Sequence, residues 1–188
     1  MVVLMLTLSE TEYAALTHRT APVNNRSAVA RNSMAVGKSF EELIIYQCRE
    51  YQKHDIAMID KTPEPFLVLK RTKDGLFSGR FTGSKAQPDF QGTIKGGRSV
   101  ILEAKYTSKD RMRQDVLTDT QAELLEIHQR LGALCLVVCS ISGKNFSVPY
   151  NVWSNMKGLY GRKYVTVEDL QKYECGGKFI DFLGRSKT

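Results

Sequence analysis

Two acidic residues and a lysine lie on either side of a glycine turn in the middle of the chain. The runs 88–94 and 99–105 are rich in β-branched and aromatic residues and flank a glycine pair, which predicts a β-hairpin. Side chains alternate along a strand, so Glu103 and Lys105 share one face of the second strand. Asp89, in the first run, is the third group of a possible hydrolytic site.

The length of the hairpin loop decides whether Asp89 joins the other two. A two-residue turn would place Asp89 opposite Ala104, on the other face, whereas a three-residue loop over 95–97 places it opposite Glu103. We expect the three-residue loop, with Gly97 in the left-handed conformation. The two carboxylates then face each other with Cβ atoms about 5 Å apart, and the lysine lies roughly 7 Å further along the strand.

A facing pair of carboxylates repels itself unless a cation lies between them. Mg²⁺ prefers oxygen ligands and is commonly held by one or two carboxylates, while it keeps waters and takes phosphate oxygens of the substrate. Lys105 can then orient or help to deprotonate the attacking water and offset charge on the phosphate. The alternative is a hairpin with three solvated charges. Residues 100–102 are apolar on both faces, which favours a central strand whose charged end opens into a cleft.

The composition indicates a polyanionic partner. The chain has 188 residues, with 27 Lys and Arg against 20 Asp and Glu and a net charge of +7, which favours nucleic acid. Residues 1–8 are apolar but too short to span a membrane and lack the features of a secretion signal, so we expect a cytoplasmic protein with no membrane partner. The four cysteines show no paired spacing, so neither a zinc site nor a disulfide is expected.

The chain is expected to divide into an N-terminal segment over 1–36 and a main nuclease domain over 37–188. Residues 9–16 predict a short helix, and 18–34 form either a mobile basic arm or a plain linker. A second helix is expected from Gly37 to about Lys53, where Ser39 and Glu42 fit a capping box. Glu41 lies at the edge of its apolar stripe and is better placed than Glu42 to reach a cleft. The alternative is that both acids are solvated first-turn residues.

A basic stretch over 70–85 follows two short predicted strands at 56–59 and 66–69. It contains a single acid, three glycines and an aromatic pair, Phe77 and Phe81. Its cations are Lys70, Arg71, Lys73, Arg80 and Lys85. The stretch predicts either a projecting basic ribbon, a stalk over about 61–86 that grips phosphates and stacks on bases, or a solvated hairpin.

The second half of the chain completes an α/β pattern. A helix is expected over 118–131, in which Gln121 either caps the helix or reaches the cleft. The remaining elements are predicted as strands at 133–139, 145–148 and 178–183 and as short helices at 151–159 and 166–173. This order is typical of a mixed sheet flanked by helices.

Pro-Asp, thirteen intervening residues and then Glu-x-Lys resembles the signature of the PD-(D/E)xK nuclease superfamily. Within it, the chain is similar to the RecU type of Holliday junction resolvase from residue 37 to about residue 152. The shared features include Gly-x-x-Phe-Glu-Glu at a helix start, a basic segment between early strands, Asp-aromatic-x-Gly, Glu-Ala-Lys-x-Thr, and a glutamine that opens the next helix. Residues before Lys38 and the loop over 106–118 match poorly.

The resemblance implies a restriction-endonuclease-like fold and a set of site residues. Asp89, Glu103 and the Ala104 carbonyl would bind Mg²⁺, with Mn²⁺ as a substitute, and Lys105 would serve the water. Glu41 and Gln121 would complete the cleft, and the basic stretch would be a stalk that enters the junction.

The expected function is therefore a structure-selective endonuclease that cuts four-way DNA junctions in recombination and repair. A junction has two-fold symmetry and needs two nicks, while one chain has one Asp-Glu-Lys set, so a homodimer is expected. Host recombination proteins are possible partners. The alternatives are a restriction-like or general repair nuclease and a DNA-binding protein with vestigial nuclease residues.

Overall fold

The structure is a computed structural model that describes residues 26–63, 66–71, 73–74, 76–81, 87–176 and 180–184. Within these ranges, the side chains of residues 26–36, 67 and 81 are not described. The predicted helix over 9–16, residues 18–25 of the predicted arm, and Lys85 lie outside the described residues.

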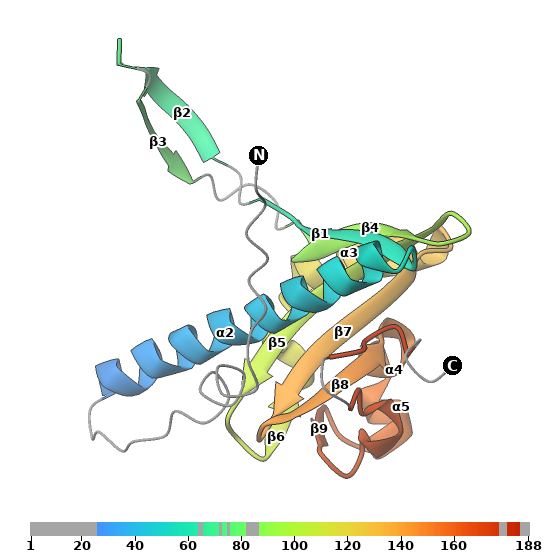
Figure 1. Ribbon diagram of the computed structural model, residues 1–188. Helices are drawn as coiled ribbons and strands as arrows, with labels where there is room; N and C mark the ends of the chain where they lie inside the picture. Colours follow the sequence, from blue (N-terminus) through green and yellow to red (C-terminus); the bar gives the residue numbers. More distant parts are fainter. Residues whose placement is uncertain are drawn as a thin grey trace.

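The centre of the molecule is a five-stranded sheet in the order β1-β4-β5-β7-β8 (Figure 1). Its strands are β1 (Ala57–Lys61), β4 (Phe90–Ile94), β5 (Arg98–Thr107), β7 (Leu134–Ile141) and β8 (Lys144–Pro149). β5 and β7 run parallel, and the other neighbouring pairs are antiparallel. The predicted mixed sheet is confirmed, and β5, which carries Glu103 and Lys105, is its middle strand.

Helices cover both faces of the sheet (Figure 1). They are α2 (Arg26–Lys53), α3 (Asp119–Arg130), α4 (Tyr150–Ser154) and α5 (Met156–Tyr160). Val100 and Leu102 of β5 pack with the apolar stripe of α2, whereas Ile101 packs with Leu125 of α3 and Trp153 of α4. Alternation along the buried middle strand therefore produces two cores, one on each face. None of the described helices is long and apolar enough to cross a membrane.

The β4–β5 hairpin has the predicted three-residue loop. Ile94 pairs with Arg98, and both intervening glycines have left-handed φ angles, 98° for Gly96 and 89° for Gly97. Only glycine adopts this region without a steric cost. Gly92 has a different reason to be glycine: a Cβ atom there would lie 2.0 Å from the backbone oxygen of Met58 in β1. The β1–β4 pair can therefore form only without a side chain at that position.

Two small sheets lie outside the central one. β2 (Phe66–Arg71) and β3 (Phe77–Phe81) form an antiparallel ribbon that projects from the body of the molecule (Figure 1). β6 (Arg111–Arg113) pairs with β9 (Tyr164–Thr166). The 3-10 helices η1 (Gln114–Val116) and η2 (Gln171–Tyr173) complete the described elements. The projecting ribbon confirms the predicted basic stalk as a structural feature.

The start of the first described helix differs from the prediction. α2 begins at Arg26 and runs through Gly37, so residues 26–34 of the predicted arm are helical. The hydroxyl of Ser39 is buried without a hydrogen-bond partner in the described structure, and the predicted capping box at Ser39 and Glu42 is wrong. Residues 26–36 contain no proline and several good helix formers, so one glycine, which costs about 1 kcal/mol in a helix, does not stop the helix. The predicted end at Lys53 is confirmed.

The C-terminal third also differs. The predicted helix over 151–159 is two short helices separated at Asn155, and the predicted helix over 166–173 is replaced by the end of β9, a turn and η2. Pairing of Thr166 with Arg111 holds the first residue of that segment in a sheet. The described part of the predicted strand over 178–183 is not a strand: it packs Ile180 and Phe182 into the α2 core.

Candidate active site

The carboxylates of Asp89 and Glu103 lie at the open end of the β4–β5 hairpin. Phe90 pairs with Leu102, so the same register places Asp89 opposite Glu103, as predicted. Oδ2 of Asp89 accepts a hydrogen bond of 2.8 Å from the Ala104 backbone N–H, which fixes this side chain across the strand pair. Glu103 is buried, with 1% of its surface exposed.

Lys105 and Gln121 complete a connected group around Glu103. Nζ of Lys105 lies 3.1 Å from Oε2 of Glu103 and 3.3 Å from Oε1 of Gln121. The side-chain amide of Gln121 donates to the same Glu103 oxygen at 2.6 Å. The structure therefore brings together Asp89, which directly precedes β4, Glu103 and Lys105 of β5, and Gln121 of α3.

Gln121 also caps the helix that carries it. Its backbone N–H donates to the Thr118 hydroxyl at 3.3 Å, and its side-chain oxygen accepts from the Thr118 N–H at 3.1 Å. These two bonds form the capping box of α3. The two alternatives for Gln121, helix cap or cleft residue, are both realised in one side-chain conformation.

The electrostatics of the pair favour a cation. Burial first, and then the negative charge of Asp89, raise the pKa of Glu103 from its ordinary value to about 7, while the ammonium of Lys105 acts in the opposite direction. A carboxylate that resists ionisation beside a second carboxylate is stabilised in its charged form by a bound positive ion.

The donor set fits a hard divalent cation with water-completed coordination. It consists of the carboxylates of Asp89 and Glu103, whose oxygen atoms are of the kind that Mg²⁺ prefers. Among the described residues there is no group of three or more His, Cys, Asp or Glu side chains that could hold a metal. Ala104 contributes an N–H bond to Asp89; a ligand role for its carbonyl stays a prediction.

Glu41 meets a basic residue at the end of the edge strand β1. Its carboxylate forms an ion pair with Lys61, the last residue of β1. Lys61 is directly opposite Phe90 and so shares with it the face covered by α2, whereas Asp89 and Glu103 lie on the α3 face. Glu41 is less exposed than Glu42, and its role in the cleft stays a prediction.

Lys61 is a residue that the sequence reasoning missed. Its backbone neighbour Thr62 donates to the backbone oxygen of Asp89 at 2.9 Å, so the end of β1 is fixed beside the site. The sequence does show a basic residue near the end of a predicted strand that precedes the hairpin. The pairing of Lys61 with Phe90 depends on the β1–β4 register, which the local sequence does not encode.

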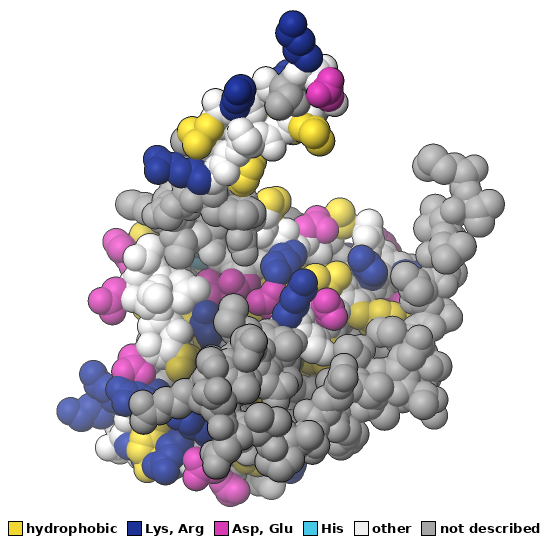
Figure 2. All heavy atoms as spheres, turned by 90° about the vertical axis from the view of Figure 1, so that its left-hand side faces the viewer, with side chains coloured by type: hydrophobic (Ala, Val, Ile, Leu, Met, Phe, Trp, Pro, Cys, Tyr) yellow, Lys and Arg dark blue, Asp and Glu magenta, His cyan; other side chains and the backbone are white. Residues whose placement is uncertain are grey.

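The predicted DNA-binding residues lie on the projecting ribbon. Lys70, Arg71, Lys73 and Arg80 are all exposed, and Figure 2 shows cationic side chains spread over the ribbon above a group of acidic side chains. The guanidinium of Arg71 stacks at 4.8 Å over the ring of Phe77, which is 53% exposed. The side chain of Phe81 and all of Lys85 lie outside the described residues.

A family model and solved structures are similar to this chain. The family model described as Recombination protein U, RecU, matches residues 35–182. Among solved structures, a Holliday junction resolvase from the archaeal hyperthermophile Archaeoglobus fulgidus, Hjc, matches with a TM-score of 0.44 and 11% identity over 72% of this chain and 88% of that chain. That likeness is too distant to bear on activity. A comparison with curated protein sequences finds no significant match.

The family match covers most of the chain, including the hairpin, α3 and the ribbon. It begins two residues before Gly37, close to the predicted start of the main domain. The chain therefore belongs to the RecU family of Holliday junction resolvases, endonucleases that act in DNA recombination.

Proposed function

We propose that Asp89, Glu103, Lys105 and Gln121 form the catalytic centre of a Mg²⁺-dependent endonuclease that resolves four-way DNA junctions. The observation that carries the proposal is the opposed pair of carboxylates, one of them buried with a raised pKa, in contact with a lysine and a glutamine. This arrangement combines two carboxylates that can hold a hard cation with the ammonium of Lys105, which is positively charged with or without the cation.

Asp89 and Glu103 would hold the ion, with the Ala104 carbonyl as a further ligand. A bound Mg²⁺ polarises the phosphoryl oxygen and favours ionisation of a water, and Mn²⁺ has the same preference for oxygen donors. The Ala104 N–H keeps Asp89 across the strand pair, and the Gln121 amide fixes the orientation of Glu103.

Lys105 is placed to act on the reacting groups. Its side chain is 17% exposed, and its ammonium lies beside the Glu103 carboxylate. In hydrolysis a water oxygen forms a bond to phosphorus, one phosphorus–oxygen ester bond breaks, and the leaving oxygen takes a proton. A fixed ammonium stabilises the extra negative charge that develops on the phosphate.

The ribbon would supply recognition of the branch. Its exposed cations neutralise phosphates, and Phe77, held under Arg71, offers a ring for stacking on an unpaired or splayed base. A homodimer would present two catalytic centres to the two strands to be nicked. We expect the protein to act in the cytoplasm, with host recombination proteins as possible partners.

A cleavage assay with matched substrates tests the proposal. The full chain is incubated with a four-way junction, a linear duplex of the same sequence and single-stranded DNA, each with Mg²⁺, Mn²⁺, Ca²⁺ or EDTA. We expect Mg²⁺-dependent and Mn²⁺-dependent symmetric nicks in the junction and little cleavage of the duplex. Equal cleavage of junction and duplex would support a general repair nuclease, and binding without cleavage would support a vestigial site.

A further inference from the structure

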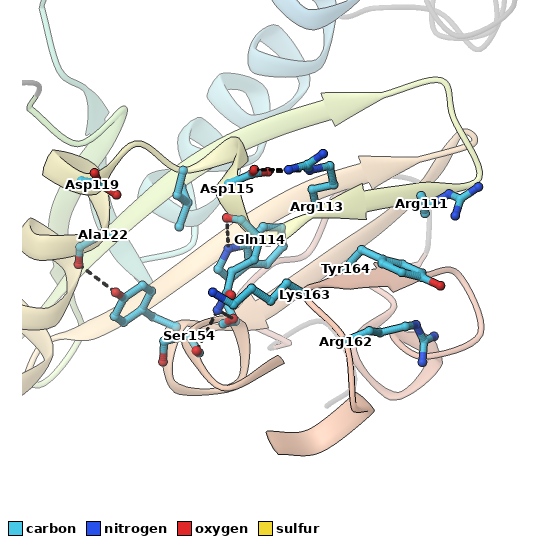
Figure 3. A pocket seen from close by; sticks show the side chains of 13 residues that line it. Arg111, Arg113, Gln114, Asp115, Asp119, Ala122, Ser154, Arg162, Lys163 and Tyr164 are labelled. Atoms are coloured by element: carbon cyan, nitrogen blue, oxygen red, sulfur yellow. Dashed lines mark hydrogen bonds and ion pairs between the residues drawn. The ribbon is translucent and has the colours of Figure 1, made fainter. Parts of the chain in front are cut away.

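A second basic region lies beside the catalytic centre and uses none of its groups. It is a pocket of about 970 Å³ between β6, η1, α4 and β9 (Figure 3). Four cationic side chains line it: Arg111, Arg113, Arg162 and Lys163. Two acidic side chains, Asp115 and Asp119, also line it, so the cations are in excess.

Tyr164 fixes two of the guanidinium groups. The Cζ atom of Arg162 lies 4.8 Å from the centre of the Tyr164 ring, and that of Arg111 lies 5.3 Å from it. Figure 3 shows the ring between the two arginines. A guanidinium stacked on a ring is held in place with its N–H donors at its edge, where they can bind an oxyanion.

Acidic partners already neutralise two of the cations. Nε of Arg113 donates to Asp115 at 2.9 Å, and Nη2 of Arg162 donates to Asp169 at 2.5 Å. These pairs fix the walls of the pocket and leave little charge for a ligand.

Arg111 and Lys163 are the two available cations: both keep N–H donors for a ligand, and the ion pair of Arg111 with Asp110 is exposed. Arg111 donates through Nε to Asp110 at 3.3 Å, and its side chain is 53% exposed. In the part of the chain that the structure describes, no acceptor binds the Nη atoms of Arg111 or the ammonium of Lys163. Both side chains are exposed, one on β6 and the other on the residue that precedes β9.

The pocket adjoins the catalytic centre through the first turn of α3. Asp119 and Ala122 line the pocket, while Gln121, which lies between them in the sequence, donates to Glu103 on the catalytic side. The β6–β9 sheet and the β2–β3 ribbon lie at opposite ends of the molecule in Figure 1, with the charged end of β5 between them.

We infer that this pocket binds the phosphodiester backbone of a DNA duplex arm, on the side of the catalytic centre away from the ribbon. The inference rests on the proposed function, since it takes junction DNA as the substrate. A row of phosphates fits the features better than a single anion does, because the pocket is large, its two available cations come from separate segments of the chain, and both are exposed. The ribbon would then recognise the branch, and the pocket would hold the arm.

A charge-matched pair of double variants tests the inference. Arg111→Gln with Lys163→Gln removes the two available cations. Lys53→Gln with Lys95→Gln removes the same charge at the other end of the hairpin, where both lysines are exposed. At about 0.1 M salt we expect the first variant to bind a long-armed junction roughly tenfold more weakly, with a salt dependence lower by about two phosphate contacts. The second variant should bind like the wild type.

Arm length separates this site from the ribbon. On junctions with progressively shorter arms, the difference between the pocket variant and the wild type should shrink and then vanish. In the wild type, a long-armed junction should protect Lys163 from acetylation, a short-armed one should not, and Lys95 should react in both cases. If the pocket variant bound every junction as tightly as the control variant does, the inference would be overturned. Binding of an acidic protein segment in the pocket in place of DNA would also overturn it. If the wild type neither binds nor cleaves junctions, the proposed function itself has failed.

Discussion

The side-chain amide of Gln121 donates a 2.6 Å hydrogen bond to Oε2 of Glu103, while the oxygen of the same amide accepts from the Thr118 N–H at 3.1 Å. One side chain therefore closes the capping box of α3 and orients the buried carboxylate. Hydrogen bonds therefore connect the start of α3 to Glu103. Substitutions at the start of α3 should change the cleavage rate, and substitutions in the catalytic centre should change the stability of the helix start.

The carboxylates and the lysine should be needed for cleavage but not for junction binding. Asp89→Asn, Glu103→Gln and Lys105→Ala should each lower the single-turnover cleavage rate in Mg²⁺ by about a hundredfold or more. Binding in Ca²⁺ or EDTA, measured by gel shift, should persist. Asp55→Asn, an exposed acid at the other end of the hairpin, is the control. Cleavage by Asp89→Asn at the wild-type rate would show that Asp89 is not part of the catalytic centre.

Thr118 and Gln121 should separate helix capping from catalysis. Thr118→Ala should lower the free energy of unfolding by about 1 kcal/mol through loss of the cap and reduce cleavage only modestly. Gln121→Ala should lower both stability and the cleavage rate, because Glu103 and Lys105 also lose a partner. Urea denaturation and single-turnover assays measure the two effects, with Thr118→Ser as the conservative control. Equal loss of cleavage in both alanine variants would show that the cap itself positions Glu103.

The carboxylate pair should destabilise the metal-free protein at high pH. The pKa of Glu103 is raised to about 7 in the folded protein, from 4.5. The folded state therefore holds a proton that the unfolded chain has released, and the free energy of unfolding falls as the pH rises between these values. Glu103→Gln should remove this dependence and stabilise the protein in EDTA at pH 8 by about 1–3 kcal/mol.

Mg²⁺ should make the wild type more stable than Glu103→Gln at pH 8. Mg²⁺ binds the folded state and should raise the melting temperature of the wild type at pH 8, while it leaves Glu103→Gln nearly unchanged. Thermal unfolding with and without Mg²⁺ is the measurement. A wild type whose stability in EDTA is the same at pH 5 and pH 8 would contradict the raised pKa.

The ribbon should contribute phosphate contacts and branch selectivity separately. Replacing Arg71, Lys73 and Arg80 with Gln should weaken junction binding and reduce its salt dependence by up to about three contacts. Phe77→Ala should lower the preference for a junction over a duplex more than it lowers duplex affinity. Equal losses on both DNAs in Phe77→Ala would reduce the ribbon to a general basic surface.

The active form should be a dimer. Light scattering should give twice the 21.2 kDa chain mass, and a supercoiled cruciform plasmid should be converted mainly to linear product within one binding event. Two centres held at a fixed separation make the second nick faster than dissociation. A monomeric mass at micromolar concentration, together with lasting nicked circles, would exclude paired nicking and leave the single-site chemistry intact.

The sequence by itself determined the hairpin, its register and most of the catalytic group. Gly96 and Gly97 allow the left-handed loop that sets Asp89 opposite Glu103, and alternation places Lys105 on the same face. Thr118 and Gln121 mark the start of α3 because a capping box lies within four consecutive residues. All of these features depend on short-range geometry, which local sequence encodes.

Tertiary structure alone decided the features that depend on which elements meet. Glu41 reaches Lys61 because the β1–β4 register sets Lys61 on the α2 face of the sheet. Residues 164–166 form a strand, although their neighbours resemble a helix start, because β6 offers them a partner. The same pairing assembles the basic pocket from segments about fifty residues apart. Contacts between segments so far apart in the sequence form only when the chain closes a long loop. A local sequence pattern therefore cannot predict them.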